Sequence, residues 1–273
     1  MKKNIYFVSD HHFGAPDRAS SLVRERRFVK LLDQIKPNVS ELYILGDLFD
    51  VWDEYKHVVP KGFVRVLGKL AEFVDDGIPI HFFVGNHDMW MIDYLEMEIG
   101  VKVYYHPKTK VFGSKKIFVG HGDGLGPKDK GYKRMKKLFR NPFFQWLYRW
   151  LHPDLGIPFA RYLSLKNKLI SGSVDLNYDG PDREWLFQYA KRKLKTEHFD
   201  YFLFGHRHLP LEISLNPQST YINIGDWITH YTYGVFDGLK LSLKHWKPNI
   251  GNLTMIEQKN LGFEQAVLIG IIN

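Results

Sequence analysis

Five short motifs in this chain carry side chains that can bind divalent metals. They read Asp10-His11-His12, Gly46-Asp47-Leu48-Phe49-Asp50, Gly85-Asn86-His87-Asp88, Gly120-His121-Gly122-Asp123 and Gly205-His206-Arg207-His208. Carboxylate and imidazole ligands together favour Mn²⁺, Fe²⁺ or Zn²⁺, and we take Mn²⁺ as the first candidate. Two such ions can share a carboxylate, lower the pKa of a water and neutralise charge on a phosphoryl group. The pattern therefore predicts a hydrolase with two divalent metal ions.

Each motif taken singly has an ordinary alternative. Asp47 could be a solvated loop carboxylate, Asn86 a left-handed turn residue, and His121 a buried histidine without a functional role. His206 and His208 are stronger candidates, because residues i and i+2 of an extended segment point to the same side. Chance rarely places metal-capable side chains in all five motifs, so their joint occurrence favours one common site.

The elements that must position these motifs can be predicted from short apolar segments. Strands are predicted over 5–8, 42–45, 78–84, 116–119, 201–204 and 221–224, from their length and their β-branched or aromatic content. Helical spacing predicts helices over 20–37, with Ser20 or Ser21 as the N-cap, over 62–76, and from Pro181 to about residue 194. The first half alternates β-α-β-α-β and the last 70 residues are mainly β. This order predicts an α/β fold. The motifs lie at strand ends, where ligand sites gather in such folds. Four of them follow a Gly, which allows a ligand to approach the backbone closely.

The order of the motifs resembles that of the calcineurin-like metallophosphoesterase superfamily, over the span from Asp10 to His208. The resemblance implies a four-layer αββα sandwich of two mixed β-sheets with helices outside. It also implies one metal ion held by Asp10, His12, Asp47 and His208, and a second held by Asp47, Asn86, His121 and His206. His87 would then be the catalytic histidine that contacts a phosphate oxygen or protonates the leaving group, and Asp88 would orient it.

Three other polar residues of these motifs are not expected to bind metal. His11 lies between two implied ligands, and we expect its imidazole to point the other way, either exposed or satisfied within the core. Asp50 and Asp123 are expected to hold loops or ligand histidines.

The composition narrows the class of protein further. The 273 residues are 44% hydrophobic and 25% charged, as in ordinary globular proteins, and we expect one metallophosphoesterase domain over 1–273. The absence of cysteine excludes disulfides, thiolate-ligated zinc, iron–sulfur clusters and a thiol nucleophile. No apolar run approaches the roughly 18–20 residues that span a bilayer, and the N-terminus lacks the pattern of a signal peptide. We therefore expect a cytoplasmic protein that can still sit on a membrane surface.

A helical segment over 124–170 interrupts the strands, and we expect it to form an insertion that acts as a lid over the active site. It contains 11 basic, two acidic and nine aromatic residues, a net charge of +9 that leaves about −1 for the rest of the chain, since the total is +8. It could be a buried helix in basic surroundings, or an amphipathic cap that takes acyl chains on its apolar side and phosphates or anionic lipid on its basic side. Aromatic residues interleaved with cations could also stack on nucleic-acid bases.

Several segments resemble the UDP-2,3-diacylglucosamine diphosphatases of lipid A synthesis, and this likeness extends to about residue 247. They are the segments 122–132 and 45–52, the Gly-His-x-His-x-Pro motif ending at Pro210, and Gly225-Asp226-Trp227. The resemblance implies hydrolysis of UDP-2,3-diacylglucosamine to UMP and 2,3-diacylglucosamine 1-phosphate, with water attacking the α-phosphorus, at the inner face of the cytoplasmic membrane. Implied substrate contacts are Asn86, His87, Asp129, Ser164, Asn167, Lys168 and His206.

One position departs from that family. Its best-known branch has Arg where this chain has His87, which exchanges a fixed cation for a group that can donate or carry a proton. Two other hypotheses stay open: a phosphodiesterase of the same superfamily that acts on a nucleotide or nucleic acid, and a non-catalytic scaffold with a decayed metal site. The presence of every implied ligand argues against the scaffold. Because the basic charge is confined to the insertion, we expect a nucleotide-activated glycolipid and an anionic membrane as partners, and no nucleic acid.

Overall fold

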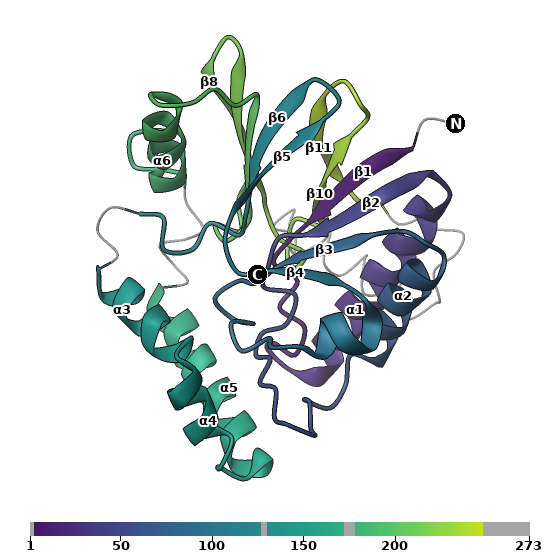
Figure 1. Ribbon diagram of the computed structural model, residues 1–273, viewed down its shortest axis with the longest axis vertical. Helices are drawn as coiled ribbons and strands as arrows, with labels where there is room; N and C mark the ends of the chain where they lie inside the picture. The colour runs from purple at the N-terminus through teal and green to yellow at the C-terminus, as the bar shows by residue number, and fades with distance from the viewer. Residues whose placement is uncertain (1–2, 127–129, 172–177, 248–273) are drawn as a thin grey trace, which may run out of the picture.

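Two mixed β-sheets pack against each other in the computed structural model, which describes residues 3–126, 130–171 and 178–247 (Figure 1). The first sheet contains β1 (Asn4–Val8), β2 (Val39–Ile44), β3 (Ile80–Phe83), β4 (Lys102–Tyr104), β10 (Thr232–Phe236) and β11 (Leu241–His245). The second contains β5 (Lys108–Phe112), β6 (Lys115–Val119), β7 (Tyr201–Phe204), β8 (Pro210–Asn216) and β9 (Ser219–Ile224). Their orders are β11-β10-β1-β2-β3-β4 and β5-β6-β7-β9-β8. In the first sheet β1 to β4 are parallel and β10 and β11 form an antiparallel edge, whereas in the second sheet β6, β7 and β9 are parallel and both edge strands are antiparallel.

Helices cover the outer faces of both sheets. The helices α1 (Arg18–Ile35) and α2 (Val64–Asp75) pack on the first sheet, and α6 (Trp185–Leu194) packs on the second (Figure 1). Alternate residues of a strand face opposite sides: in β1, Tyr6 packs in the cluster under α1 and α2, whereas Phe7 packs between the sheets. The layers are therefore helix, sheet, sheet and helix, which confirms the predicted αββα sandwich.

All six predicted strands are present, but two predicted helix starts are wrong. The first helix is capped by Asp17, whose carboxylate accepts the backbone N–H of Ser20 at 2.9 Å, so neither Ser20 nor Ser21 is the cap. The third begins at Trp185 instead of Pro181, because Glu184 adopts the extended conformation of an N-cap. Two short helices, a 3₁₀-helix (Lys36–Asn38) and a π-helix (Leu95–Ile99), were not predicted.

The parallel strands carry the five metal-capable motifs to one region. Asp10 and Asp47 follow β1 and β2, and Asn86 follows β3, all neighbours in the first sheet. His121 and His206 follow β6 and β7, which are parallel neighbours in the second sheet. Because parallel strands end at the same edge, each sheet delivers its motifs to its own carboxyl edge.

Three helices form the insertion between β6 and α6: α3 (Lys130–Phe139), α4 (Pro142–Tyr148) and α5 (Pro153–Ser171). They lie together beside the two sheets (Figure 1). The indole N–H of Trp90 donates to the Phe139 carbonyl at 2.7 Å, and the Tyr148 hydroxyl donates to Asp53 Oδ2 at 2.9 Å. Loops at the carboxyl edge of the first sheet thus hold the insertion.

Asp53 makes this attachment dependent on pH. The side chain is buried, and burial raises its carboxyl pKa from 3.8 to about 7, against the opposing hydrogen bond from Tyr148. Between pH 4 and 7 the folded protein therefore holds a proton at Asp53 that the unfolded chain has released, so Asp53 lowers stability as pH rises. We expect Asp53→Asn, which cannot ionise and still accepts from Tyr148, to raise the Tm by several degrees at pH 8. The gain should fade as the pH falls to 4, and a gain that is equal at both pH values would contradict this reading.

Candidate metal centre

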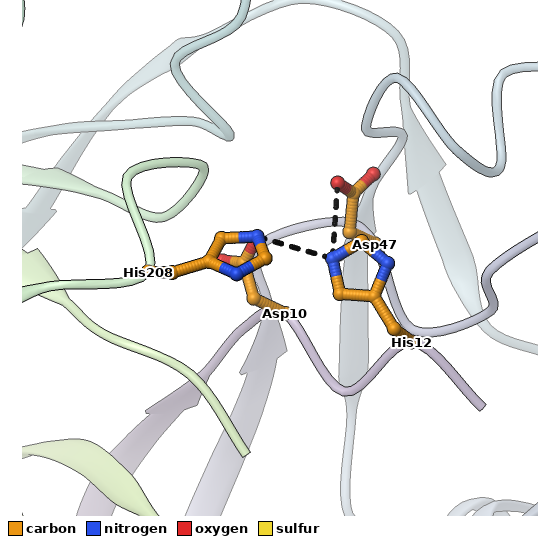
Figure 2. A group of neighbouring side chains, drawn as sticks. All are labelled: Asp10, His12, Asp47 and His208. Carbon is orange, nitrogen blue, oxygen red and sulfur yellow. Dashed lines mark hydrogen bonds and ion pairs between the residues drawn. The ribbon is translucent and has the colours of Figure 1, made fainter. Parts of the chain in front are cut away.

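The first implied ligand set comes together in the structure (Figure 2). One ligand atom from each of Asp10, His12, Asp47 and His208 lies within 4.8 Å of the others. His12 Nε2 lies 3.6 Å from Asp47 Oδ2 and 3.2 Å from His208 Nε2, and His208 Nε2 lies 3.3 Å from Asp10 Oδ1. These four side chains come from three strand ends of two different sheets.

The second implied set lies on the other side of the same carboxylate. Asp47, His121 and His206 offer ligand atoms that lie within 4.8 Å of one another. His121 Nε2 is 3.4 Å from Asp47 Oδ2 and 3.0 Å from the amide oxygen of Asn86. Asp47 therefore belongs to both groups, which is the position that the resemblance implies for a shared carboxylate.

Two of the predicted ligand histidines are held through the ring nitrogen that faces away from the centre. His121 Nδ1 lies 2.7 Å from the Leu45 carbonyl, and His12 Nδ1 lies 3.2 Å from Asp50 Oδ1. Since these oxygens accept hydrogen bonds, each Nδ1 carries a hydrogen and each Nε2 faces the carboxylates of the centre. This is the usual way in which an outer partner orients a metal-ligating imidazole, and it gives Asp50 the role expected for it.

The backbone at the site is strained in a way that points to function. Asp10, His12, Asp47, His206 and His208 have φ between 46° and 68°, and only two other non-glycine residues in the described ranges have positive φ. Such conformations persist where the surroundings over-determine them, and they cluster at functional sites. They also show that the expectation of an extended segment at His206 and His208 is wrong. The two imidazoles meet the centre because both residues are left-handed.

Glycines before the motifs allow the two sheets to approach closely. A Cβ at Gly85 would overlap the Asp47 carboxylate, and one at Gly205 would overlap Ser9 and Asp10. A Cβ at Gly46 would lie 2.6 Å from His121 Nδ1. Glycine is therefore required here for close approach, as the sequence suggested.

The donor set fits a pair of divalent cations. His12 Nε2 and His208 Nε2 face each other at 3.2 Å, and within the described part of the chain Asp10 Oδ1 is buried without a hydrogen bond. Burial opposes ionisation of Asp47, but the charges of His121 and His87 outweigh it and hold its pKa well below the usual range. Carboxylates and imidazole nitrogens that converge in a buried place form a ligand set that suits divalent cations.

His87 lies beside the first group with one ring nitrogen fixed. His87 Nδ1 lies 2.9 Å from the backbone carbonyl of Asp50, so Nδ1 carries the hydrogen and Nε2 is left for chemistry. Ser164, from α5, donates to Asp50 Oδ2 at 3.1 Å and lies 3.2 Å from His87 Nδ1. The structure thus brings Ser164 of the insertion to the predicted catalytic histidine. His12, Asp50 and His87 also offer ligand atoms that lie within 4.8 Å of one another. Because Asp50 contacts the Nδ1 atoms of both histidines, hydrogen bonding accounts for this cluster.

Asp88 does not take the place expected for it beside His87. Its Oδ1 accepts the backbone N–H of Gly85 at 2.6 Å, and its Oδ2 accepts that of Leu48 at 3.0 Å. Burial, followed by the charge of Asp47, raises the pKa of Asp88 to about 8. The carboxyl therefore ties the second and third motifs together beneath the site, and Asp50 holds His87 in its place.

The remaining predicted residues divide into three kinds. His11 points away into the core, where its ring centroid lies 4.1 Å from that of Phe28, and burial lowers its pKa well below the usual range. Asp123 forms an ion pair with Lys136 of α3, so it anchors the insertion. Asp129 lies outside the described residues, as do the side chains of Asn167 and Lys168 in α5.

Asp226 also lies beside the site, although its sequence motif predicted no role for it. Asp226 follows β9, Asp226 Oδ2 lies 3.8 Å from His208 Nδ1, and its Oδ1 accepts three backbone N–H groups of the next turn. The signal was available, because Asp226 follows a glycine at a strand end as Asp47 does.

A cleft of about 860 Å³ opens at His121 beneath α3. One wall is apolar and includes Met91, Ile92, Tyr104 and Leu125. The lining also includes four cations of α3 and the residue that follows it: Lys133, Lys136, Lys137 and Arg140. The cleft therefore combines apolar and cationic side chains next to His121.

A two-sheet sandwich with this donor set at its strand ends defines the class of the protein as a metal-dependent phosphoesterase. Residues 3–210 match the family model described as calcineurin-like phosphoesterase, and the chain belongs to this family. This confirms the superfamily predicted from the order of the motifs.

Relatives from several bacteria align with nearly the whole chain. It is 38% identical over 256 residues to the UDP-2,3-diacylglucosamine hydrolase of Porphyromonas gingivalis, an alignment that covers 89% of this chain and 98% of that protein. It is 27% identical over 236 residues to the protein of the same name from Shewanella frigidimarina, covering 84% and 90% of the two chains. It is 26% identical to the one from Pseudomonas paraeruginosa, covering 82% and 91%.

Proposed function

We propose that this protein hydrolyses the pyrophosphate bond of UDP-2,3-diacylglucosamine in lipid A biosynthesis. The products would be UMP and 2,3-diacylglucosamine 1-phosphate, with water attacking the α-phosphorus. The observation that carries the proposal is the cleft at His121, which combines an apolar wall with four cations beside the carboxylate of Asp47. The names of the aligned relatives support the same substrate.

Two divalent cations fit the donor set. Asp10, His12, Asp47 and His208 would hold one, and Asp47, Asn86, His121 and His206 the other, with Mn²⁺ as first choice and Fe²⁺ or Zn²⁺ as alternatives. When bound, such ions stabilise the negative charge of a phosphoryl group and lower the pKa of a water.

The chain's own residues supply orientation and proton transfer. His87 Nδ1 is held by the Asp50 carbonyl, so Nε2 is the atom that can donate to a phosphate oxygen or protonate the leaving group. The apolar side of the cleft suits acyl chains, and Lys133, Lys137 and Arg140 suit phosphate oxygens. Asn86, Asp129, Ser164, Asn167, Lys168 and His206 remain predicted substrate contacts.

The proposal is tested by removing the acyl chains from the substrate. Burial of each methylene contributes about 0.8 kcal/mol, so UDP-N-acetylglucosamine should be hydrolysed with a kcat/KM lower by orders of magnitude than UDP-2,3-diacylglucosamine. Equal turnover of both would reject the lipid substrate and favour a general nucleotide phosphodiesterase.

We also propose that the insertion places the protein on an anionic membrane surface. Among the described residues, no helix is both long and apolar enough to cross a membrane, so attachment would be peripheral. On and next to α4, Phe143, Trp146 and Trp150 are 61%, 52% and 74% exposed, and the structure describes no buried residue in α4. The nearby Arg134, Lys137 and Arg161 are also exposed. Aromatic residues flanked by cations suit the boundary between acyl chains and anionic headgroups.

Replacement of Trp146 and Trp150 together by serine should weaken binding to phosphatidylglycerol vesicles at least tenfold. Burial of each large apolar side chain contributes about 1.5–3 kcal/mol. Trp146 and Trp150 are both exposed in the structure and can therefore insert into the membrane surface. Co-sedimentation with vesicles measures the effect. As a matched control, Met97→Ser with Leu239→Ser removes side chains that are 79% and 71% exposed outside the insertion. If both pairs of substitutions had the same effect, the insertion would not be the membrane-facing surface.

A further inference from the structure

The loop that carries His206 and His208 has a buried ion pair on its other side. Arg207 lies between the two histidines, and its Nε donates to Glu184 Oε2 at 3.1 Å. The two side chains are only 10% and 1% exposed. A buried arginine and glutamate beside two histidines of the site need an explanation, since removing both charges from water is costly.

Glu184 is held by contacts with two elements, the helix α6 and the strand β9 of the second sheet. It is the N-cap of α6, and Glu184 Oε1 lies 3.4 Å from both the backbone N–H nitrogen of Leu186 and the hydroxyl of Tyr221 in β9. The next residue, Trp185, packs edge-on against the His206 ring, with centroids 5.7 Å apart. The start of α6 therefore contacts both His206 and its neighbour Arg207.

The loop requires such support because its backbone is strained. His206 and His208 have φ of 68° and 55°, conformations that are costly for non-glycine residues and persist only where surroundings enforce them. On the side of the metal-capable groups, the His206 backbone N–H donates to Asp10 Oδ2 at 2.9 Å. On the opposite side, the Arg207–Glu184 pair attaches the loop to α6.

We infer that Glu184 and Arg207 form a positioning pair that holds His206 and His208 in their ligand-presenting conformation. Neither residue is placed at the substrate or at the metal-capable atoms, so the pair acts through the two histidines, one in each ligand group. The inference rests on the proposed metal centre and is independent of which phosphoester is hydrolysed.

The alternative is that the pair only stabilises the fold, and metal affinity separates the two roles. Partners that orient metal ligands typically change metal affinity or activity by about 10–100-fold when they are removed. A pair that only stabilised the fold would lower the Tm and leave the affinity of the folded protein for metal unchanged.

The test is Mn²⁺ binding by calorimetry to the full-length chain after chelation, with Tm recorded for each variant. We expect Arg207→Met to weaken Mn²⁺ binding about 10–100-fold at a temperature where the variant is folded. The matched control is Arg183→Met, which changes an arginine that is 78% exposed and adjacent to Glu184, and should bind Mn²⁺ as the wild type does.

A second variant keeps the test decisive if Arg207→Met does not fold. Glu184→Gln with Arg207→Met removes both charges and leaves no unpaired buried ion, and it should show the same loss of Mn²⁺ affinity. Wild-type Mn²⁺ affinity in either folded variant would overturn the inference. Failure to hydrolyse UDP-2,3-diacylglucosamine would leave this result unaffected, because the assay uses Mn²⁺ alone.

Discussion

Asp47→Asn is expected to lower kcat by about 10³-fold or more and to reduce the amount of bound metal. Asp47 contributes to both groups of ligand atoms, 3.6 Å from His12 Nε2 and 3.4 Å from His121 Nε2. Metal ions contribute several kcal/mol of charge stabilisation to phosphoryl transfer, and about 4 kcal/mol corresponds to 10³-fold in rate. Asparagine has the same shape and can still accept the backbone N–H of His87, which donates to Asp47 Oδ1 at 2.9 Å, so the loops should keep their arrangement.

The measurement combines steady-state kinetics with metal analysis of the purified variant. Asp154→Asn is the control, because it makes the same substitution on a carboxylate that is 87% exposed in the insertion, and it should leave both quantities unchanged. Wild-type turnover and metal content in Asp47→Asn, or activity that survives chelation, would show that the reaction does not depend on this centre.

His87→Ala is expected to lower kcat by about 10²–10⁴-fold, the usual contribution of a general acid or base, while both metals are retained. The reason is the geometry of the ring: Nδ1 is held by the Asp50 carbonyl at 2.9 Å, and the remaining Nε2 is the only ring atom left for proton transfer. Removal of the imidazole should therefore change the rate of the chemical step and not the ligand set.

Two comparisons decide whether His87 has this role. His198→Ala removes a histidine that is 53% exposed at the start of the segment before β7 and should have no effect. If His87→Ala lost metal together with activity, His87 would be a ligand or a support of one, and its assignment as a proton donor would be wrong.

The sequence indicated the fold and the donor set because both depend on local signals. A short apolar run followed by a polar side chain, in four of the five motifs with Gly between them, predicts a strand that ends at a ligand site. The motifs that contain Asp10, Asp47, Asn86, His121 and His206 all lie at such strand ends. Parallel pairing then brings their ends together, since each predicted strand lies beside another strand of the same direction.

Contacts between motifs could not be read from the sequence. Asp88 was expected to hold His87 from the family resemblance and the usual pairing of a carboxylate with an imidazole. Its oxygens instead accept the backbone N–H groups of Gly85 and Leu48, and the backbone carbonyl of Asp50 in another motif holds the histidine. The left-handed backbone of His208 was missed for a similar reason. His208 contacts His12 and Asp10 of the first sheet, and no local residue type signals its left-handed conformation.

The insertion shows the same limit on a larger scale. Its pattern predicted helices, which the structure shows as α3, α4 and α5, but the pattern does not say which of its cations and aromatic side chains are covered. In the structure Trp150 is 74% exposed, whereas Ser164 is buried beside His87. The way in which α3, α4 and α5 pack against the sheets decides which residues are exposed, such as Trp150, and which reach the metal centre, such as Ser164.

The most direct test of the central claim is incubation of the protein with UDP-2,3-diacylglucosamine and Mn²⁺ in ¹⁸O-labelled water. We expect release of UMP and 2,3-diacylglucosamine 1-phosphate in equal amounts, with ¹⁸O incorporated into UMP. After chelation of the metal we expect no release. Absence of UMP, or the label in the sugar phosphate, would contradict the proposed attack of water on the α-phosphorus at the centre built around Asp47.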